Sequence, residues 1–194
     1  MSTEGFLTFV AGGVEISSFN KWSSCPRHLG LRVLRWLREA VTDPDALAAA
    51  IARLRYVDSV GVPTAEEIQR FHKYVTRNEP PFDDLYDWYY LLRDTQSDPA
   101  MILEAGLITD IGSMTLPWDP GMHYGYVIDT DTRVFEVYEG PSDHTRRARG
   151  RFAEQPAPGS DPDGSPWPAA MLVLSWPFDA LPTDDAFLAA TANI

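Results

Sequence analysis

Residues 124–140 read YGYVIDTDTRVFEVYEG, and this stretch decides the fold that the sequence predicts. Two runs rich in β-branched and aromatic residues flank an Asp/Thr turn, which is the pattern of a β-hairpin. A second hairpin is predicted at 6–19, where Gly12-Gly13 supplies the positive φ angles of a type I′ turn. Strands that come in hairpins, rather than alternating with single helices, favour an antiparallel sheet.

Between the two hairpins the apolar spacing changes to that of amphipathic helices. Helices are predicted at 29–39, 42–54, 62–75, 80–96 and 97–106. A short apolar run at 171–176 is a further predicted strand, and 183–191 is a predicted C-terminal helix. The sequence therefore predicts an α+β fold with one antiparallel sheet of about five strands, built from two hairpins and a late strand, and a central block of four to five helices.

The length and composition indicate one domain over 1–194, with 140–168 as a long flexible loop that holds six prolines and four glycines. Apolar residues make up 44% of the chain, which is enough for a core without a metal or a disulfide. The single cysteine fits a reducing, cytoplasmic setting. We expect no signal peptide and no membrane span, because no window approaches 18 uninterrupted apolar residues.

Two places could carry nucleophilic chemistry. Ser2 follows the initiator Met, so its hydroxyl and free α-amine could act together as in N-terminal nucleophile hydrolases; the alternative is a frayed terminus. Cys25 and His28 are close in the sequence SSCPRH, where a helix start could lower the pKa of the thiol; the alternative is a free thiol in a loop.

Motifs for metals and cofactors are not found in the sequence. The four histidines show no HExxH spacing, one cysteine does not make a zinc cluster, and neither a P-loop nor a GxGxxG is present. The stretch SDPDGSPW at 160–167 begins like a calcium loop but has Leu172 in place of the bidentate Glu, so we interpret it as a turn. We therefore expect no metal and no cofactor.

Charge is distributed unevenly along a chain whose formal net charge is −12. The stretch RRARGR is either a solvated loop tip or a contact for phosphate or an acidic partner; its arginines are Arg146, Arg147, Arg149 and Arg151. In 79–110, eight acidic residues accompany one base and a group of aromatics. The residues of an acidic aromatic binding face in this stretch would be Asp83, Tyr86, Asp87, Tyr89 and Tyr90. The alternative is that both sides of this helix are covered by the core.

Five stretches together resemble an uncharacterised family of small acidic proteins from actinobacteria and their phages. They are TEGFLTFV, SFNKWSSCPRHLGLRVLRWL, DWYYLLRDTQSDPAMILEAG, YGYVIDTDTRVFEVYEG and LVLSWPFDALP. The resemblance covers most of the chain. It implies a bacterial or phage cytoplasmic setting, and it implies no activity and no functional residues, because the family has no established activity.

These observations favour a non-enzymatic protein-binding or regulatory protein that acts through the acidic aromatic surface. The first alternative is a hydrolase of the N-terminal nucleophile type that uses Ser2. The second is an acidic mimic of nucleic acid, suggested by the net charge. We expect the partner to be another protein; a membrane is not expected, and nucleic acid is expected only through the arginines of 146–151.

Overall fold

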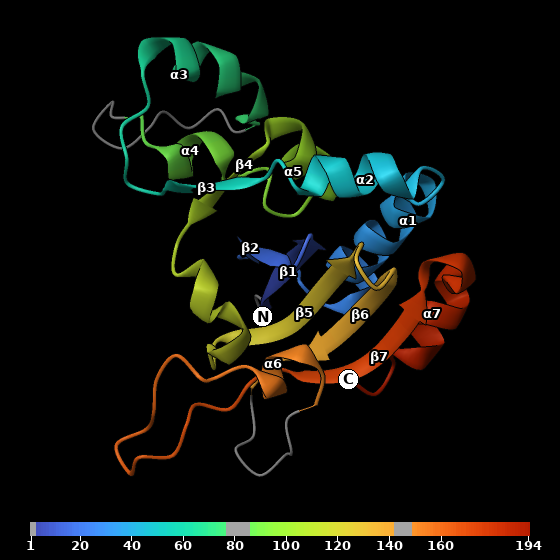
Figure 1. Ribbon diagram of the computed structural model, residues 1–194. Coiled ribbons are helices and arrows are strands. Elements are labelled where there is room, and N and C mark those ends of the chain that lie inside the picture. Colours follow the sequence, from blue (N-terminus) through green and yellow to red (C-terminus); the bar gives the residue numbers. More distant parts are fainter. Residues whose placement is uncertain (1–2, 77–85, 142–148) are drawn as a thin grey trace.

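The computed structural model describes residues 3–76, 86–141 and 149–194, and its centre is a five-stranded sheet in the order β2-β1-β5-β6-β7 (Figure 1). The strands of this main sheet are β1 (Glu4–Ala11), β2 (Val14–Asn20), β5 (Met122–Asp129), β6 (Val134–Glu139) and β7 (Met171–Pro177). Strands and helices occupy separate stretches of the chain for the most part, so the predicted α+β class is confirmed.

Both predicted hairpins are present. Gly12 and Gly13 have φ angles of 60° and 74°, as the type I′ turn requires. The β5–β6 and β6–β7 pairs are also antiparallel, whereas β1 pairs with β5 in parallel. Two-residue turns force antiparallel pairing within a hairpin, but the long helical connection between β2 and β5 lets the second hairpin return in either direction. The sheet is therefore mostly antiparallel with one parallel pair.

The turns of the two hairpins are joined through Asp131. Its two carboxylate oxygens accept hydrogen bonds from the backbone N–H groups of Gly12 and Gly13, each at 2.7 Å. Asp129 accepts from the N–H groups of Asp131 and Thr132, both at 2.9 Å, which shapes the β5–β6 turn itself. The predicted role of these two aspartates in turn chemistry is confirmed, and Asp131 in addition closes the end of the parallel β1–β5 pair.

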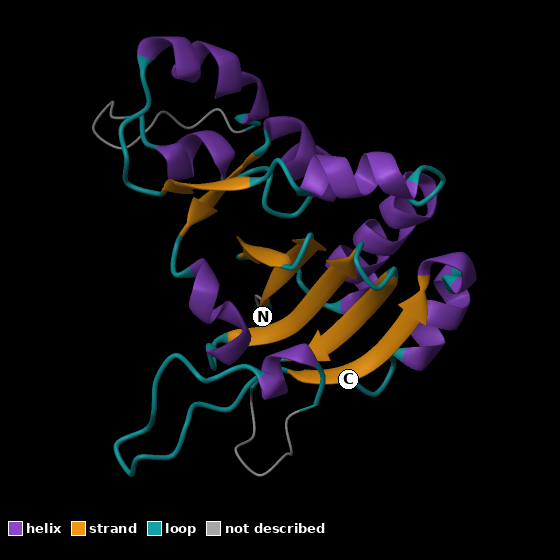
Figure 2. Cartoon of the chain, in the orientation of Figure 1, coloured by secondary structure: helices purple, strands orange, loops and turns teal. Residues whose placement is uncertain are grey.

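Most helices form a layer on one face of the main sheet or a separate group above its β2 edge, and two short helices lie on the other face (Figure 2). They are the π-helix η1 (Pro26–Gly30), α1 (Leu31–Ala40), α2 (Pro44–Ile51), α3 (Ala65–Phe71), the 3-10 helix η2 (His72–Tyr74), α4 (Trp88–Leu92), α5 (Pro99–Ala105), the 3-10 helix η4 (Ser113–Trp118), α6 (Arg151–Glu154), the 3-10 helix η5 (Phe178–Ala180) and α7 (Asp184–Ala190). Among the described residues, no helix is both long enough and apolar enough to cross a membrane.

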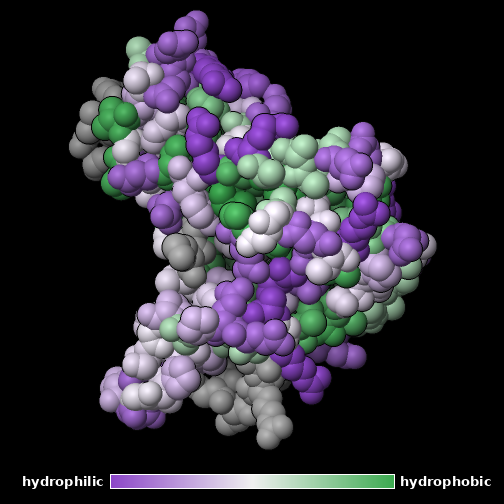
Figure 3. Space-filling view, viewed as in Figure 1, coloured by the Kyte–Doolittle hydropathy of each residue, from purple (hydrophilic) through white to green (hydrophobic). Residues whose placement is uncertain are grey.

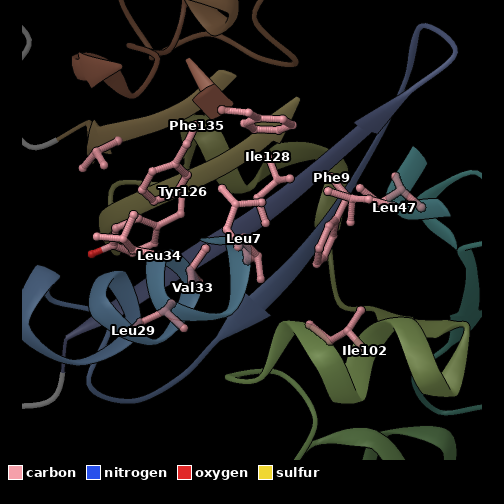
Figure 4. Close-up of a cluster of buried hydrophobic side chains, with 14 of the residues drawn as sticks. Leu7, Phe9, Leu29, Val33, Leu34, Leu47, Ile102, Tyr126, Ile128 and Phe135 are labelled. Carbon is pink, nitrogen blue, oxygen red and sulfur yellow. The ribbon is translucent and has the colours of Figure 1, made fainter. Parts of the chain in front are cut away.

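The largest core lies between the helical layer and one face of the main sheet (Figure 4). Leu7 and Phe9 of β1 and Leu34 of α1 belong to this core, and Tyr126 and Phe135 stack in it at 6.3 Å between ring centroids. All five side chains are fully buried. Because alternate residues of a strand face opposite sides of a sheet, Phe6 and Val10 of the same strand point to the other face.

A small parallel sheet of β3 (Arg55–Asp58) and β4 (Leu107–Asp110) was not predicted. Each strand has four residues, which is too short for the period-2 pattern to be read from sequence. This sheet has its own core with α3, α4 and α5, in which Phe71 packs edge-on against Trp88 at 5.3 Å. Residues of the expected acidic aromatic surface belong to this second unit.

The other face of the main sheet is covered by η4 and α6, where Trp118 and Phe152 pack on Phe6 and Tyr138. Residues 151–154 form a helix where the sequence predicted a loop, and Phe152 is 1% exposed. A single apolar residue among prolines and charges gives no periodic signal, which is why this helix was missed. Residues 142–148 of the predicted loop lie outside the described residues.

Candidate functional site

The aromatic segment of the acidic stretch forms a much shorter helix than predicted. The sequence favours a helix over 80–96, but α4 spans Trp88–Leu92. Asp87 caps it by accepting a hydrogen bond from the N–H of Tyr90 at 2.6 Å. The predicted binding residue Asp83 lies outside the described residues.

The predicted face of three tyrosines is divided between the core and the surface. Tyr90 is 9% exposed, its ring meets that of Tyr86 edge-on at 5.3 Å, and the Arg93 guanidinium lies 5.2 Å from its ring centre. Tyr90 is therefore a core residue, and its prediction as an exposed contact is wrong. Tyr86 and Tyr89 are half-buried, and a helix of five residues does not present all three rings on one open side.

Tyr89 lines a pocket of about 400 Å³ that the sequence did not reveal, here called the Trp22 pocket. The other lining residues come from the loop after β2 and from the chain on either side of α4. They are Asn20, Lys21, Trp22, Thr76, Arg93, Asp94, Gln96 and Ser97. Trp22 is 53% exposed, and the Lys21 ammonium lies 5.4 Å from its ring centre. Two aromatic rings thus stand beside a strongly polar lining.

The loop that carries Trp22 is held by a buried network. The Asn20 side-chain amide donates to the Trp22 carbonyl at 2.7 Å and to the Ser24 hydroxyl at 2.6 Å. The Tyr126 hydroxyl donates to the Ser24 carbonyl at 2.8 Å, and burial raises the pKa of Tyr126 well above its ordinary value, so it stays a donor. Ser23 adopts a φ angle of 56°, uncommon for a residue other than glycine. This wall of the pocket is pre-organised.

The polar side of the pocket contains one buried donor without a partner. Gln96 is 6% exposed, and among the described residues its Nε2 atom has no hydrogen-bond partner. Its neighbours are paired: Thr76 donates to Asp94 at 2.8 Å, and Arg32 donates to the Ser97 hydroxyl at 2.9 Å. An unpaired buried donor costs about 1–3 kcal/mol, and such groups in a native fold call for an explanation.

The structure places the candidate nucleophiles of the sequence as follows. Ser2 lies outside the described residues. Cys25 is half-buried at the start of η1, where its carbonyl accepts from the His28 N–H at 3.0 Å, and His28 is exposed. Cys25 and His28 are thus joined by a backbone turn, and in the described part of the chain no thiol–imidazole hydrogen bond links them.

The four arginines of the predicted loop do not share one environment. Arg146 and Arg147 lie outside the described residues, and Arg149 is exposed. Arg151, expected at a solvated loop tip or on a partner, instead points onto the main sheet, with 16% of its side chain exposed. Its prediction as a binding residue is wrong, because its guanidinium is already engaged within the chain.

Three carboxylates from three strands surround the Arg151 guanidinium. It donates to Glu136 of β6 at 2.8 Å, to Glu15 of β2 at 3.1 Å, and to Asp129 of β5. Burial alone would raise the pKa of the Asp129 carboxyl, but the hydrogen bonds from Arg151 and Thr132 outweigh burial and lower it. The same carboxylates raise the pKa of Arg151 above its ordinary value despite burial. The cluster fixes α6 on the sheet, and Asp129 and Arg151 stay ionised at neutral pH.

Sequence reasoning missed the Trp22 pocket and the Arg151 cluster for one reason. Both join residues more than fifty positions apart, and no local spacing reports such contacts. The available signal was an isolated Trp22 between polar residues in a loop, which is unusual for a residue type that is buried on average. Within the described ranges, no three His, Cys, Asp or Glu side chains are placed to hold a metal ion.

Comparison of the chain with models of protein families, with curated proteins and with solved structures finds no match.

Proposed function

We propose that this protein acts by binding a segment of another protein at the Trp22 pocket, without catalysing a reaction there. The observation that carries the proposal is the position of Gln96, whose buried Nε2 atom lacks a hydrogen-bond partner among the described residues while the residue lines a pocket flanked by Trp22 and Tyr89. A peptide carbonyl that enters this pocket would accept from Gln96 and bury both rings.

The lining favours recognition of a peptide. Exposed or half-buried aromatic residues beside polar groups are enriched at protein interfaces, and rigid aromatic anchors contribute much of their binding energy. Lys21 and Asp94 place both signs of charge at the same pocket, which suits a peptide bond and its polar side chains. The Ser97 hydroxyl accepts from the Arg32 guanidinium, so it does not resemble a nucleophile next to a base.

The compartment and the type of partner that we propose are suggested by the sequence. The single cysteine and the resemblance to small acidic proteins of actinobacteria and their phages suit a cytoplasmic partner in a bacterial host. The acidic character of the chain would favour a partner with a basic binding segment, because complementary charge speeds encounter.

The test is affinity capture from the native host with quantitative mass spectrometry, using wild type, Trp22→Ala and Tyr89→Ala. We expect the captured partner to lose at least about 2 kcal/mol of binding free energy in each variant, which is roughly a thirtyfold weaker affinity. Trp167→Ala is the matched control, since it removes another partly exposed tryptophan from a different part of the surface. A partner retained equally by all variants would contradict this site.

Replacing Gln96 by Leu separates binding from stability. The change removes a buried donor that lacks a partner, so we expect a free energy of unfolding equal to wild type or higher by about 1 kcal/mol. Partner affinity should fall, because the acceptor in the peptide then loses its donor. Denaturant unfolding and a binding titration measure the two quantities. A clearly destabilised Gln96→Leu variant would show that this amide has a structural role and would remove the main support for the site.

A further inference from the structure

A second pocket lies on the other side of the main sheet, between the end of η4 and the segment 155–168. Its volume is about 420 Å³, within the range of small-ligand sites. The residues that line this two-tryptophan pocket are Thr115, Trp118, Asp119, Pro120, Asp161, Trp167 and Pro168. Figure 3 shows that the molecule is hollowed on this side, between the part that carries α3 and α4 and the part formed by 155–168.

Trp118 forms the fixed wall of this pocket. It is 6% exposed and belongs to the core on this face of the sheet, where its ring meets Phe152 edge-on at 5.9 Å. Phe152 in turn packs on Tyr138 at 4.8 Å. Because α6 is anchored through Arg151, the position of the Trp118 ring is determined by the sheet rather than by a surface loop.

Trp167 also lines the pocket and is also held in place, although it is 38% exposed. Its backbone N–H donates to the Gly159 carbonyl at 3.1 Å, and its ring packs so closely over Gly159 that a Cβ there would lie 2.9 Å from it. The segment is closed by a bridge between Ser160 and Pro166 and by the predicted DPDG turn. The indole is therefore presented by an internally bonded loop.

The charge at the pocket is negative. Asp119 is half-buried, and one carboxylate oxygen accepts from the Gly121 N–H at 2.8 Å, which orients the group. The Glu4 carboxylate also approaches Gly121. Among the described lining residues, none carries a positive charge. Asp119 is therefore the carboxylate that we assign to the pocket.

We propose that the two-tryptophan pocket binds a trimethylammonium group. Indole is the side chain that attracts a cation most strongly, and two indoles with one carboxylate and two prolines form a cage for a cation with an apolar surface. Such a group has no N–H donors to satisfy, which suits walls that offer few acceptors. The same chemistry occurs in free choline-type molecules, in trimethylated lysine side chains and in phosphocholine headgroups.

The test is a calorimetric titration of the full chain with choline chloride, against 3,3-dimethylbutan-1-ol at matched ionic strength. The alcohol has the same shape without the charge, so it should bind at least about tenfold more weakly than choline. Equal affinity for choline and the alcohol would overturn the proposal, as would the lack of choline binding to a protein that melts cooperatively.

Variants locate the binding. Trp167→Ala should weaken choline binding at least about tenfold, Trp167→Phe less, and Asp119→Asn by a smaller factor that shrinks in high salt. Val62→Ala is the control, since Val62 is 80% exposed and lies outside the lining of this pocket, and it should bind choline as wild type does. Thermal melts establish that each variant is folded. Choline binding that survives Trp167→Ala, or that is lost in Val62→Ala, would overturn the assignment.

Three probes distinguish the sources of the group. They are free choline, a short peptide with one trimethyl-lysine, and vesicles of a phosphocholine lipid. The source is the probe that binds most tightly, and an excess of tetramethylammonium should displace it. A probe that binds without displacement by tetramethylammonium would count against this pocket.

Discussion

Replacing Arg151 by Met should lower the free energy of unfolding by about 3–5 kcal/mol, because it leaves a group of buried carboxylates without their cation. Glu136 and Asp129 have 11% and 4% of their side chains exposed, so water cannot replace the guanidinium. For a chain of this length, such a loss corresponds to a fall in Tm of about 6–20 °C. Thermal and denaturant melts at pH 7 measure it.

The size of this loss should depend on pH in a defined direction. In the wild type the pKa of Asp129 is lowered by folding, so its contribution is present above its unfolded pKa near 3.8 and is lost as the pH falls through the folded value. Without Arg151, neighbouring carboxylates repel one another and their pKa values rise. Protonation of these carboxylates then stabilises the folded variant. The loss of unfolding free energy relative to wild type should therefore be largest at pH 7 and smaller near pH 5.

Arg149→Met is the matched control for Arg151→Met. It makes the same chemical change two residues earlier, at an exposed position, and should stay within about 0.5 kcal/mol of wild type. An Arg151→Met protein that melts within about 2 °C of wild type, or whose deficit grows on acidification, would contradict the role assigned to the cluster.

Local chemistry explains which elements could be predicted from the sequence. The Gly12-Gly13 turn, the Asp98 cap before Pro99, and the Thr64–Glu67 capping box each act within a few residues. The glycine turn correctly placed the first hairpin, and helices were correctly expected within 62–75 and 97–106. The same logic gave the α+β class, because hairpins and helices can be recognised without knowing how they pack.

Contacts across the chain explain what could not be predicted. The parallel pairing of β1 with β5 and the placement of α6 depend on partners more than a hundred residues away, such as Glu15 for Arg151. The sequence of an arginine cluster does not reveal whether one side chain packs onto a sheet or all of them are exposed to water. The tyrosines show the same limit, since Tyr90 and Tyr89 are adjacent but only Tyr90 is buried.

Truncating Phe152 to Ala should cost about 3–5 kcal/mol, although the sequence placed this residue in a loop. Its ring is 1% exposed and contacts Phe6 at 5.7 Å, Trp118 at 5.9 Å and Tyr138 at 4.8 Å. These neighbours belong to the sheet and to η4, so they cannot collapse far to fill the space. Denaturant unfolding measures the loss, and Phe152→Leu should lose less because it leaves a smaller cavity.

Phe152 and Arg151 hold the same four-residue helix, so their effects should not add. Once Phe152→Ala has loosened α6, the guanidinium is held less firmly, and removing it should cost less than in wild type. We therefore expect the Arg151→Met/Phe152→Ala protein to lose less free energy than the sum of the single losses, by about 1–3 kcal/mol. Limited trypsin digestion of Phe152→Ala should likewise expose cleavage after Arg151, which the docked helix protects in wild type. Full additivity together with unchanged protection would mean that apolar packing and the ion cluster act on independent parts of the fold.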